Sequence, residues 1–88
     1  PVNTTLSNQP NPFNTTTVVS YSIDNPAQVE LEIYSLLGEV VHRVDAGVQQ
    51  AGIYELPFNA SNLPNGIYMC HLKINGTTAN SVKMIIAR

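Results

Sequence analysis

The last quarter of the chain carries the feature that most limits its possible folds, two apolar runs joined by Asn75-Gly76. Asn-Gly is the strongest short-range signal for a two-residue hairpin turn, because both central positions of that turn take positive φ. The run before it, residues 67–74, is rich in β-branched, aromatic and other apolar residues, which suit a half-buried pleated strand. The run after it, residues 82–87, alternates between two faces, and residues 77–81 fit either the turn or the start of this strand. The sequence therefore predicts a C-terminal β-hairpin whose second strand has an apolar face made of Val82, Met84 and Ile86.

The rest of the chain alternates between short apolar segments and turn residues. The additional strands that we predict are residues 15–23, 29–34, 39–45 and 53–58. The turns and loops that we predict between the strands are residues 24–26, 35–38, 46–52 and 59–66. Residues 1–9 are polar and predict a linker or an edge strand.

Three of these strands carry more specific expectations. The strand over residues 29–34 has an aliphatic inner face and an outer face with Glu30 and Glu32, which we expect to be solvated. In the next strand the face of Val40 and Val44 is expected to point inward, although the register is open. Pro57 cannot donate to a strand ladder, so its strand is expected at a sheet edge.

Six to seven short strands bounded by turns, without helical periodicity, are typical of an antiparallel β-sandwich. We therefore predict an all-β fold, a small immunoglobulin-like sandwich, with a small barrel as the alternative. The 88 residues match the size of one domain, so a single domain is expected over residues 1–88.

The stretch Pro10-Asn11-Pro12-Phe13-Asn14 interrupts the strand pattern near the N-terminus. Each proline sets φ near −65°, lacks a backbone donor and restricts the preceding residue. These properties predict a stiff, extended segment that cannot join the middle of a sheet. Phe13 is expected to close one end of the core.

Composition excludes several function classes. The net charge is −2 and the four basic residues are scattered, whereas a nucleic-acid site needs clustered Lys and Arg. The one cysteine, Cys70, allows no internal disulfide and is expected to pack in the core. No apolar run reaches the ~18–20 residues of a membrane span. The chain begins at Pro1 with a polar stretch and without a signal peptide, so we expect it to be a piece of a longer protein.

The sequence offers no catalytic or ligand-binding constellation. His42 and His71 stand alone in strands, and no residues have zinc or EF-hand spacing, so we expect no catalysis, cofactor, metal or small-molecule substrate. A carbohydrate-binding module remains an alternative, but sugar sites use exposed aromatic platforms. The chain has no Trp, and Tyr34 is the one aromatic residue that we place on an outer face.

Three separated stretches together resemble a known family, the type A C-terminal sorting domain of proteins exported by the type IX (Por) secretion system of Bacteroidota-like bacteria. PNPFN at residues 10–14 is similar to the opening of that family, and IYSLLG at residues 33–38 is similar to its IYDLLG strand and turn. GIYMCHL at residues 66–72, followed by KMII at residues 83–86, resembles its ending. The residues that this resemblance implies as the sorting motif are Pro10, Asn11, Pro12, Phe13, Asn14, Gly38, Gly66, Tyr68, Leu72, Gly76, Lys83, Met84 and Ile86.

The resemblance implies a secretion signal and not a catalyst. Domains of this family direct an attached cargo from the periplasm across the outer membrane to the cell surface or the medium. Their implied partners are the type IX translocon with its shuttle protein and a surface sortase, which removes the domain. We expect the closing strand of the hairpin at residues 66–88 to lie at a sheet edge, where its free backbone groups accept a partner strand. The alternative is an immunoglobulin-like accessory or spacer module, similar to that of the flagellar hook-capping protein, which does not have to end its polypeptide.

Overall fold

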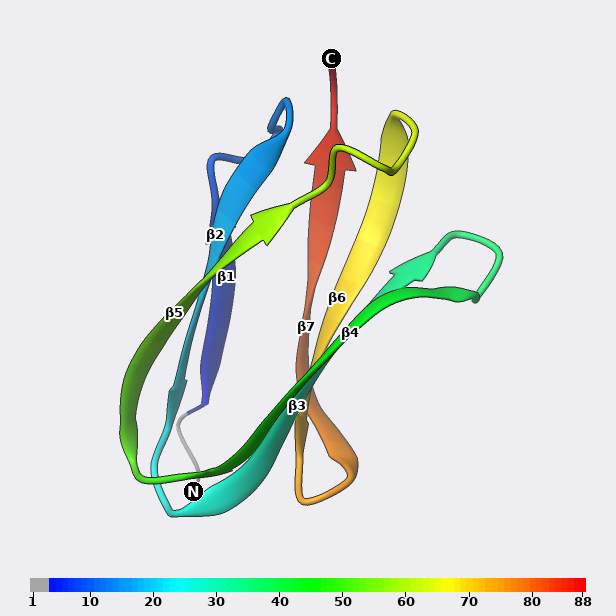
Figure 1. Cartoon of the computed structure of the whole chain (residues 1–88). Coiled ribbons are helices and arrows are strands. Elements are labelled where there is room, and N and C mark those ends of the chain that lie inside the picture. Colours follow the sequence, from blue (N-terminus) through cyan, green and yellow to red (C-terminus); the bar gives the residue numbers. More distant parts are fainter. Residues whose placement is uncertain (1–3) are drawn as a thin grey trace.

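The structure is a computed structural model that describes residues 4–88, which form seven β-strands and no helix (Figure 1). All strand pairs within the two sheets are antiparallel. The strands are β1 (Thr5–Gln9), β2 (Thr16–Ile23), β3 (Ala27–Ser35), β4 (Val40–Gln49), β5 (Gly52–Asn59), β6 (Gly66–Ile74) and β7 (Thr77–Ile86).

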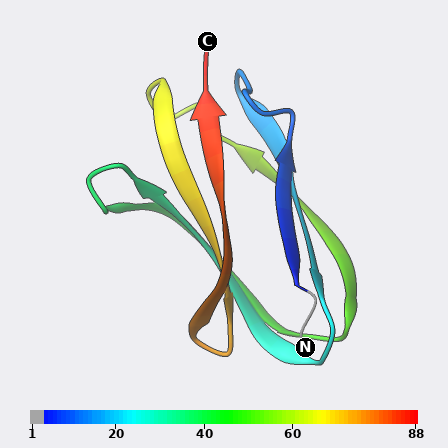
Figure 2. The ribbon, with the colours of Figure 1, turned by 180° about the vertical axis from the view of Figure 1, so that it is seen from behind.

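The strands form two sheets that face each other (Figures 1 and 2). One sheet has three strands in the order β1-β2-β5, and the other has four in the order β4-β3-β6-β7. The chain passes between the sheets after β2, β4 and β5, while β3–β4 and β6–β7 are hairpins within the larger sheet. This arrangement confirms the small immunoglobulin-like β-sandwich. The strand that contains Pro57 lies at an edge, as predicted, and so does β1.

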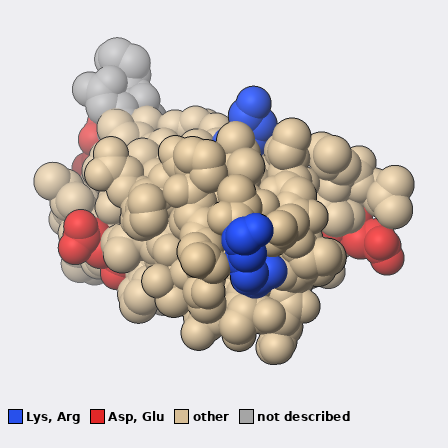
Figure 3. All heavy atoms as spheres, turned by 90° about the horizontal axis from the view of Figure 1, so that it is seen from above, with Lys and Arg blue, Asp and Glu red and all other residues tan. Residues whose placement is uncertain are grey.

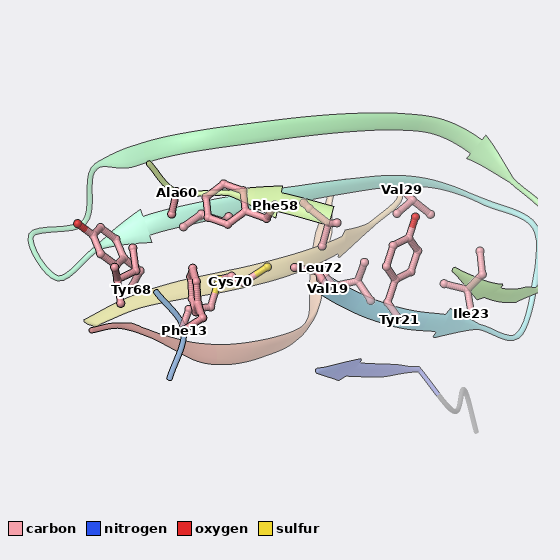
Figure 4. Packing of buried hydrophobic residues seen from close by; sticks show 14 residues of the cluster. Phe13, Val19, Tyr21, Ile23, Val29, Phe58, Ala60, Tyr68, Cys70 and Leu72 are labelled. Atoms are coloured by element: carbon pink, nitrogen blue, oxygen red, sulfur yellow. The ribbon is translucent and has the colours of Figure 1, made fainter. Parts of the chain in front are cut away.

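The core lies between the sheets and takes side chains from both inner faces (Figure 4). Val29, Leu31 and Ile33 of β3 are all buried, which confirms the unbroken alternation of that strand. On β7, Met84 and Ile86 are buried and Val82 is half-buried, as the hairpin pattern predicts.

Asn75 and Gly76 form the predicted hairpin turn, with φ of 51° and 84°. The Asn75 side chain also accepts a hydrogen bond from the Gln28 amide at 2.9 Å. Because β7 begins at Thr77, the residues that fitted either turn or strand are strand. The turn therefore sets the register of the whole hairpin.

The predicted loop over residues 46–52 is wrong, because β4 continues to Gln49 and β5 begins at Gly52. The first residues of β3 need backbone hydrogen-bonding partners, and β4 supplies them by extending until Gln49 pairs with Ala27. A β-bulge opposite Val29 absorbs the extra residue. Gly47 takes a φ of 69° there and donates its amide hydrogen to the Asp45 carboxylate at 3.0 Å.

A second bulge explains why only part of the β4 face prediction is right. The register shifts between Ile33 and Tyr34, so that β4 rotates between Val40 and His42. Val44 packs against the core as expected, whereas Val40 is 49% exposed. Val41, expected outside, also packs against the core.

Candidate functional site

The closing strand β7 lies at the border of the four-stranded sheet, as expected for the hairpin. Its inner face contributes Met84 and Ile86 to the core, and its register places them opposite Tyr68 and Gly66 of β6. The Tyr68 hydroxyl donates a hydrogen bond to the Pro64 carbonyl at 2.7 Å. The end of β7 and the start of β6 therefore form one end of the sandwich.

The PNPFN segment (residues 10–14) lies along the outer border of β7. The Asn11 side chain donates to the Lys83 carbonyl at 2.8 Å and accepts from the Ile85 amide at 3.0 Å. Phe13 then donates its amide hydrogen to the Ile85 carbonyl and accepts from the Ala87 amide, both at 2.9 Å. The side-chain amide of Asn11 thus satisfies two backbone groups that a neighbouring strand would otherwise pair, and the backbone of Phe13 satisfies two more.

This contact corrects two expectations. The PNPFN segment is not extended: it bends, with cis peptide bonds before Pro10 and Pro12, and only Phe13 makes a bridge, parallel to Ile86. The border of β7 is not free where we expected it to accept a partner strand. The PNPFN segment occupies four backbone groups there: the Lys83 carbonyl, the Ile85 amide and carbonyl, and the Ala87 amide.

The base of the PNPFN segment is held by side chains of β1 and β2. The Thr17 hydroxyl donates to the Pro10 carbonyl at 2.9 Å and accepts from the side-chain amide of Asn8 at 3.4 Å. Phe13 is buried in the core cluster, which confirms that it closes one end of the core (Figure 4). The segment is therefore fixed by the hydrogen bond to Pro10, by the buried ring of Phe13 and by its contacts with the border of β7.

Arg88 also ties down the end of the described chain, and sequence reasoning missed it. Its guanidinium donates to the Leu63 carbonyl at 2.7 Å and to the Ala60 carbonyl. Asn65 accepts from the Arg88 amide and donates to the Arg88 carbonyl, both at 3.2 Å. The signal that was available is Asn65 in the turn before Gly66, but no local pattern connects it to a residue 23 positions later.

The structure brings together most, but not all, residues that the resemblance implied. Those gathered at the end of β7 are Pro10, Asn11, Pro12, Phe13, Gly66, Tyr68, Lys83, Met84 and Ile86. Leu72 is buried farther along β6, and Gly76 turns the hairpin at the opposite end. Gly38 lies in the β3–β4 turn with a φ of 87°. Asn14 is exposed, and its side chain accepts a hydrogen bond from the neighbouring Thr15 hydroxyl.

The outer face of the larger sheet carries a cluster of charges around Glu32. Lys73 contacts one carboxylate oxygen of Glu32 at 2.8 Å, and the Tyr34 hydroxyl donates to the same oxygen at 2.6 Å. Arg43 contacts the other oxygen at 3.6 Å and also pairs with Glu30. The hydrogen bonds from Lys73 and Tyr34 lower the pKa of Glu32. Glu32 is buried beneath these partners, so the expectation that it is solvated is wrong.

The side chains expected to be inert are held by apolar or aromatic neighbours. Burial raises the pKa of the Cys70 thiol to about 12, so very little of it is thiolate at neutral pH. The ring centroid of His42 lies 5.0 Å from that of Phe58. The ring centroid of His71 lies 4.7 Å from that of Tyr34. Among residues 4–88 no three His, Cys, Asp or Glu side chains are grouped so that they can hold a metal ion. That part of the chain also has no helix long and apolar enough to span a membrane.

Comparison with known proteins identifies the family. The family model described as the secretion system C-terminal sorting domain matches residues 9–87, from the last residue of β1 to the residue after β7. Searches of curated proteins and of solved structures found no match. The matched range contains both the PNPFN segment and the strand that it borders, and the chain therefore belongs to the type IX secretion C-terminal sorting domain family.

Proposed function

We propose that this domain directs an attached cargo protein across the outer membrane by the type IX system and is then removed by a surface sortase. Membership of the family implies a secreted protein routed to the cell surface or the extracellular space, and a partnership with the type IX machinery. The proposal adds a route through the periplasm, recognition by the translocon and its shuttle protein, and cleavage before the folded domain. A domain of this kind is a secretion signal and does not itself catalyse a reaction.

One observation supports a signal that is recognised as a folded unit. The PNPFN segment and the end of β7 are 72 residues apart between Asn11 and Lys83, yet they are joined by four hydrogen bonds. A linear peptide signal does not require such a contact. Residues at both ends of the matched range therefore present one surface only when the domain is folded.

The occupied border of β7 changes how recognition is expected to work. Addition of a partner strand to Ile85 requires the PNPFN segment to leave, which breaks bonds made by Asn11 and exposes the buried Phe13. Recognition without that cost uses side chains on the outer face of the hairpin. We therefore propose that the translocon binds the outer face of the residue 66–88 hairpin and leaves its border occupied.

The test is export of a reporter that carries a periplasmic signal peptide at its N-terminus and this domain at its C-terminus. We expect surface or extracellular reporter in a bacterium with a type IX system, and periplasmic reporter in the same bacterium without a functional translocon. Export that does not depend on the translocon would contradict the proposal. Periplasmic retention in both strains would favour the accessory or spacer module.

A matched pair of variants tests whether the folded contact matters. Asn11→Ala removes two hydrogen bonds to β7, whereas Asn14→Ala removes only a contact to the adjacent Thr15. We expect Asn11→Ala to lower the urea midpoint and export together, and Asn14→Ala to change neither. Deletion of residues 83–88 is less informative, because it also removes two core side chains and the Arg88 contacts.

A further inference from the structure

The outer face of the larger sheet is divided into a charged half and an apolar half. In the half toward the Asn75 turn, cross-strand neighbours are charged or polar: Glu30 lies beside Lys73, and Glu32 lies between Arg43 and His71. This half follows the usual rule that the outer face of an antiparallel sandwich is polar. The half toward the end of β7 does not follow it.

In that second half, apolar side chains are neighbours across four strands. Tyr34 lies between Val40 of β4 and Met69 of β6, and Ile67 of β6 lies opposite Ile85 of β7. The β3–β4 turn follows Ser35, which pairs with Tyr68. Figure 2 shows that this turn projects beyond the end of the sheet. We call the following set the outer apolar patch: Tyr34, Leu36, Leu37, Val40, Ile67, Met69 and Ile85.

Several members of the patch are far more exposed than side chains of their kind usually are. Leu36 is 70% exposed, Leu37 is 87% exposed, Val40 is 49% exposed and Ile67 is 39% exposed. Exposed apolar side chains that are cross-strand neighbours, as Val40 and Tyr34 are, mark an interaction site more often than a single exposed leucine does. Figure 3, which looks onto the end of the molecule where β7 ends, shows few charged side chains among the other residues.

Lys83 gives the patch a charge that nothing within the described chain neutralises. It lies on the outer face of β7 opposite Met69 and is exposed. Arg43 and Lys73 pair with glutamates and Arg88 binds carbonyl groups, but Lys83 has no ion pair within residues 4–88. An acidic group of a partner therefore complements this surface.

We infer that the outer apolar patch and Lys83 form the docking surface for the secretion machinery, and that its partner presents apolar side chains with a carboxylate placed to pair with Lys83. This inference rests on the proposed function and assigns it a surface. It also accounts for the apolar middle of the SLLG turn, which contributes nothing to the core.

Charge argues for this partner over a membrane surface. An anionic membrane surface is bound by clusters of four or more Lys and Arg. Here one unpaired Lys83 is accompanied by the exposed Glu39 next to Val40.

The test uses the reporter fusion in the type IX bacterium with variants inside and outside the patch. Leu36→Ser with Leu37→Ser, and separately Lys83→Glu, are each expected to reduce export about tenfold with an unchanged urea midpoint. Lys83→Arg is expected to export like the parent. The matched control is Ile53→Ser, because Ile53 is 82% exposed but lies on β5 of the other sheet.

The outcomes separate the inference from the proposed function. If the parent fusion is exported only with the translocon and both patch variants are exported equally well, the docking surface is wrong and the sorting function stands. If the parent fusion is not exported, both the proposed sorting function and the docking surface are wrong. Sedimentation of the purified domain provides a second measurement: a dimer that Leu37→Ser dissociates would identify a second copy as the occupant and overturn the inference.

Discussion

Tyr68→Ala tests how far the end of β7 depends on one buried ring. Tyr68 is 6% exposed and lies on the inner face of β6, opposite Met84 and beside Ser35 of β3. In Figure 4 its ring lies at the end of the core near Ala60 and Phe13. Its removal leaves a cavity at the place where the PNPFN segment, β6 and β7 meet.

The magnitude follows from two contributions. Truncation of a buried aromatic side chain to alanine costs about 3–5 kcal/mol, and a site at the end of the core can partly collapse, so we expect about 3 kcal/mol. The hydroxyl contributes a further part through its hydrogen bond to the Pro64 carbonyl, about 1 kcal/mol or less because Pro64 is exposed to water. A domain of this size has a free energy of unfolding of roughly 4–13 kcal/mol, so Tyr68→Ala removes a large share of it.

Urea unfolding followed by far-ultraviolet circular dichroism measures these changes. With a slope of about 1 kcal/mol per molar urea, Tyr68→Ala is expected to lower the midpoint by about 3 M. Tyr68→Phe keeps the ring and loses only the hydroxyl, so with the same slope we expect it to lower the urea midpoint by about 1 M or less. Equal midpoints for Tyr68→Ala and the parent would refute the core placement. Equal losses for the two variants would show that the hydroxyl, and not the ring, carries the stabilisation.

Three further predictions concern other parts of the sandwich. The Cys70 thiol is expected not to react with a disulfide reagent near neutral pH until urea unfolds the domain, because burial raises its pKa to about 12; fast reaction of the native protein would contradict this. The lowered pKa of Glu32 means that its contribution to stability is complete above the ordinary glutamate range and is lost as the pH falls through its folded value. Urea midpoints measured from neutral to acidic pH are therefore expected to fall less in Glu32→Gln than in the parent, and parallel curves would exclude this cause. Gly76→Ala places a side chain at a φ of 84° and is expected to cost about 1–2 kcal/mol, whereas an unchanged midpoint would mean that the turn relaxes freely.

Local patterns in the sequence were sufficient wherever the controlling interactions are between near neighbours. The alternation in β3 placed its aliphatic residues inside, and Asn75-Gly76 placed the hairpin turn, because both depend on properties of a few consecutive residues. Proline chemistry likewise kept residues 10–14 out of the middle of a sheet.

Sequence reasoning failed where a residue depends on a distant one. Residues 46–49 have a loop-like composition, but they are strand because the far end of β3 needs a paired backbone. Glu32 looked solvated because alternation gives only its face, and Lys73 and Tyr34 cover it on that face. The alternation of side chains along a strand predicts which face of the sheet a residue occupies, but it does not predict which side chains pack beside that residue.

The two-sheet β fold, its closing hairpin and the motifs that identify the family could all be inferred from the order of the amino acids. Periodicity and turn chemistry, on which these inferences depend, act within a few residues. The folded arrangement was needed to show that Asn11 and Phe13 occupy the border of β7, that Arg88 is bound to the chain around Asn65, and that several apolar side chains and Lys83 are exposed. These contacts join groups that become neighbours only after the sheets have packed.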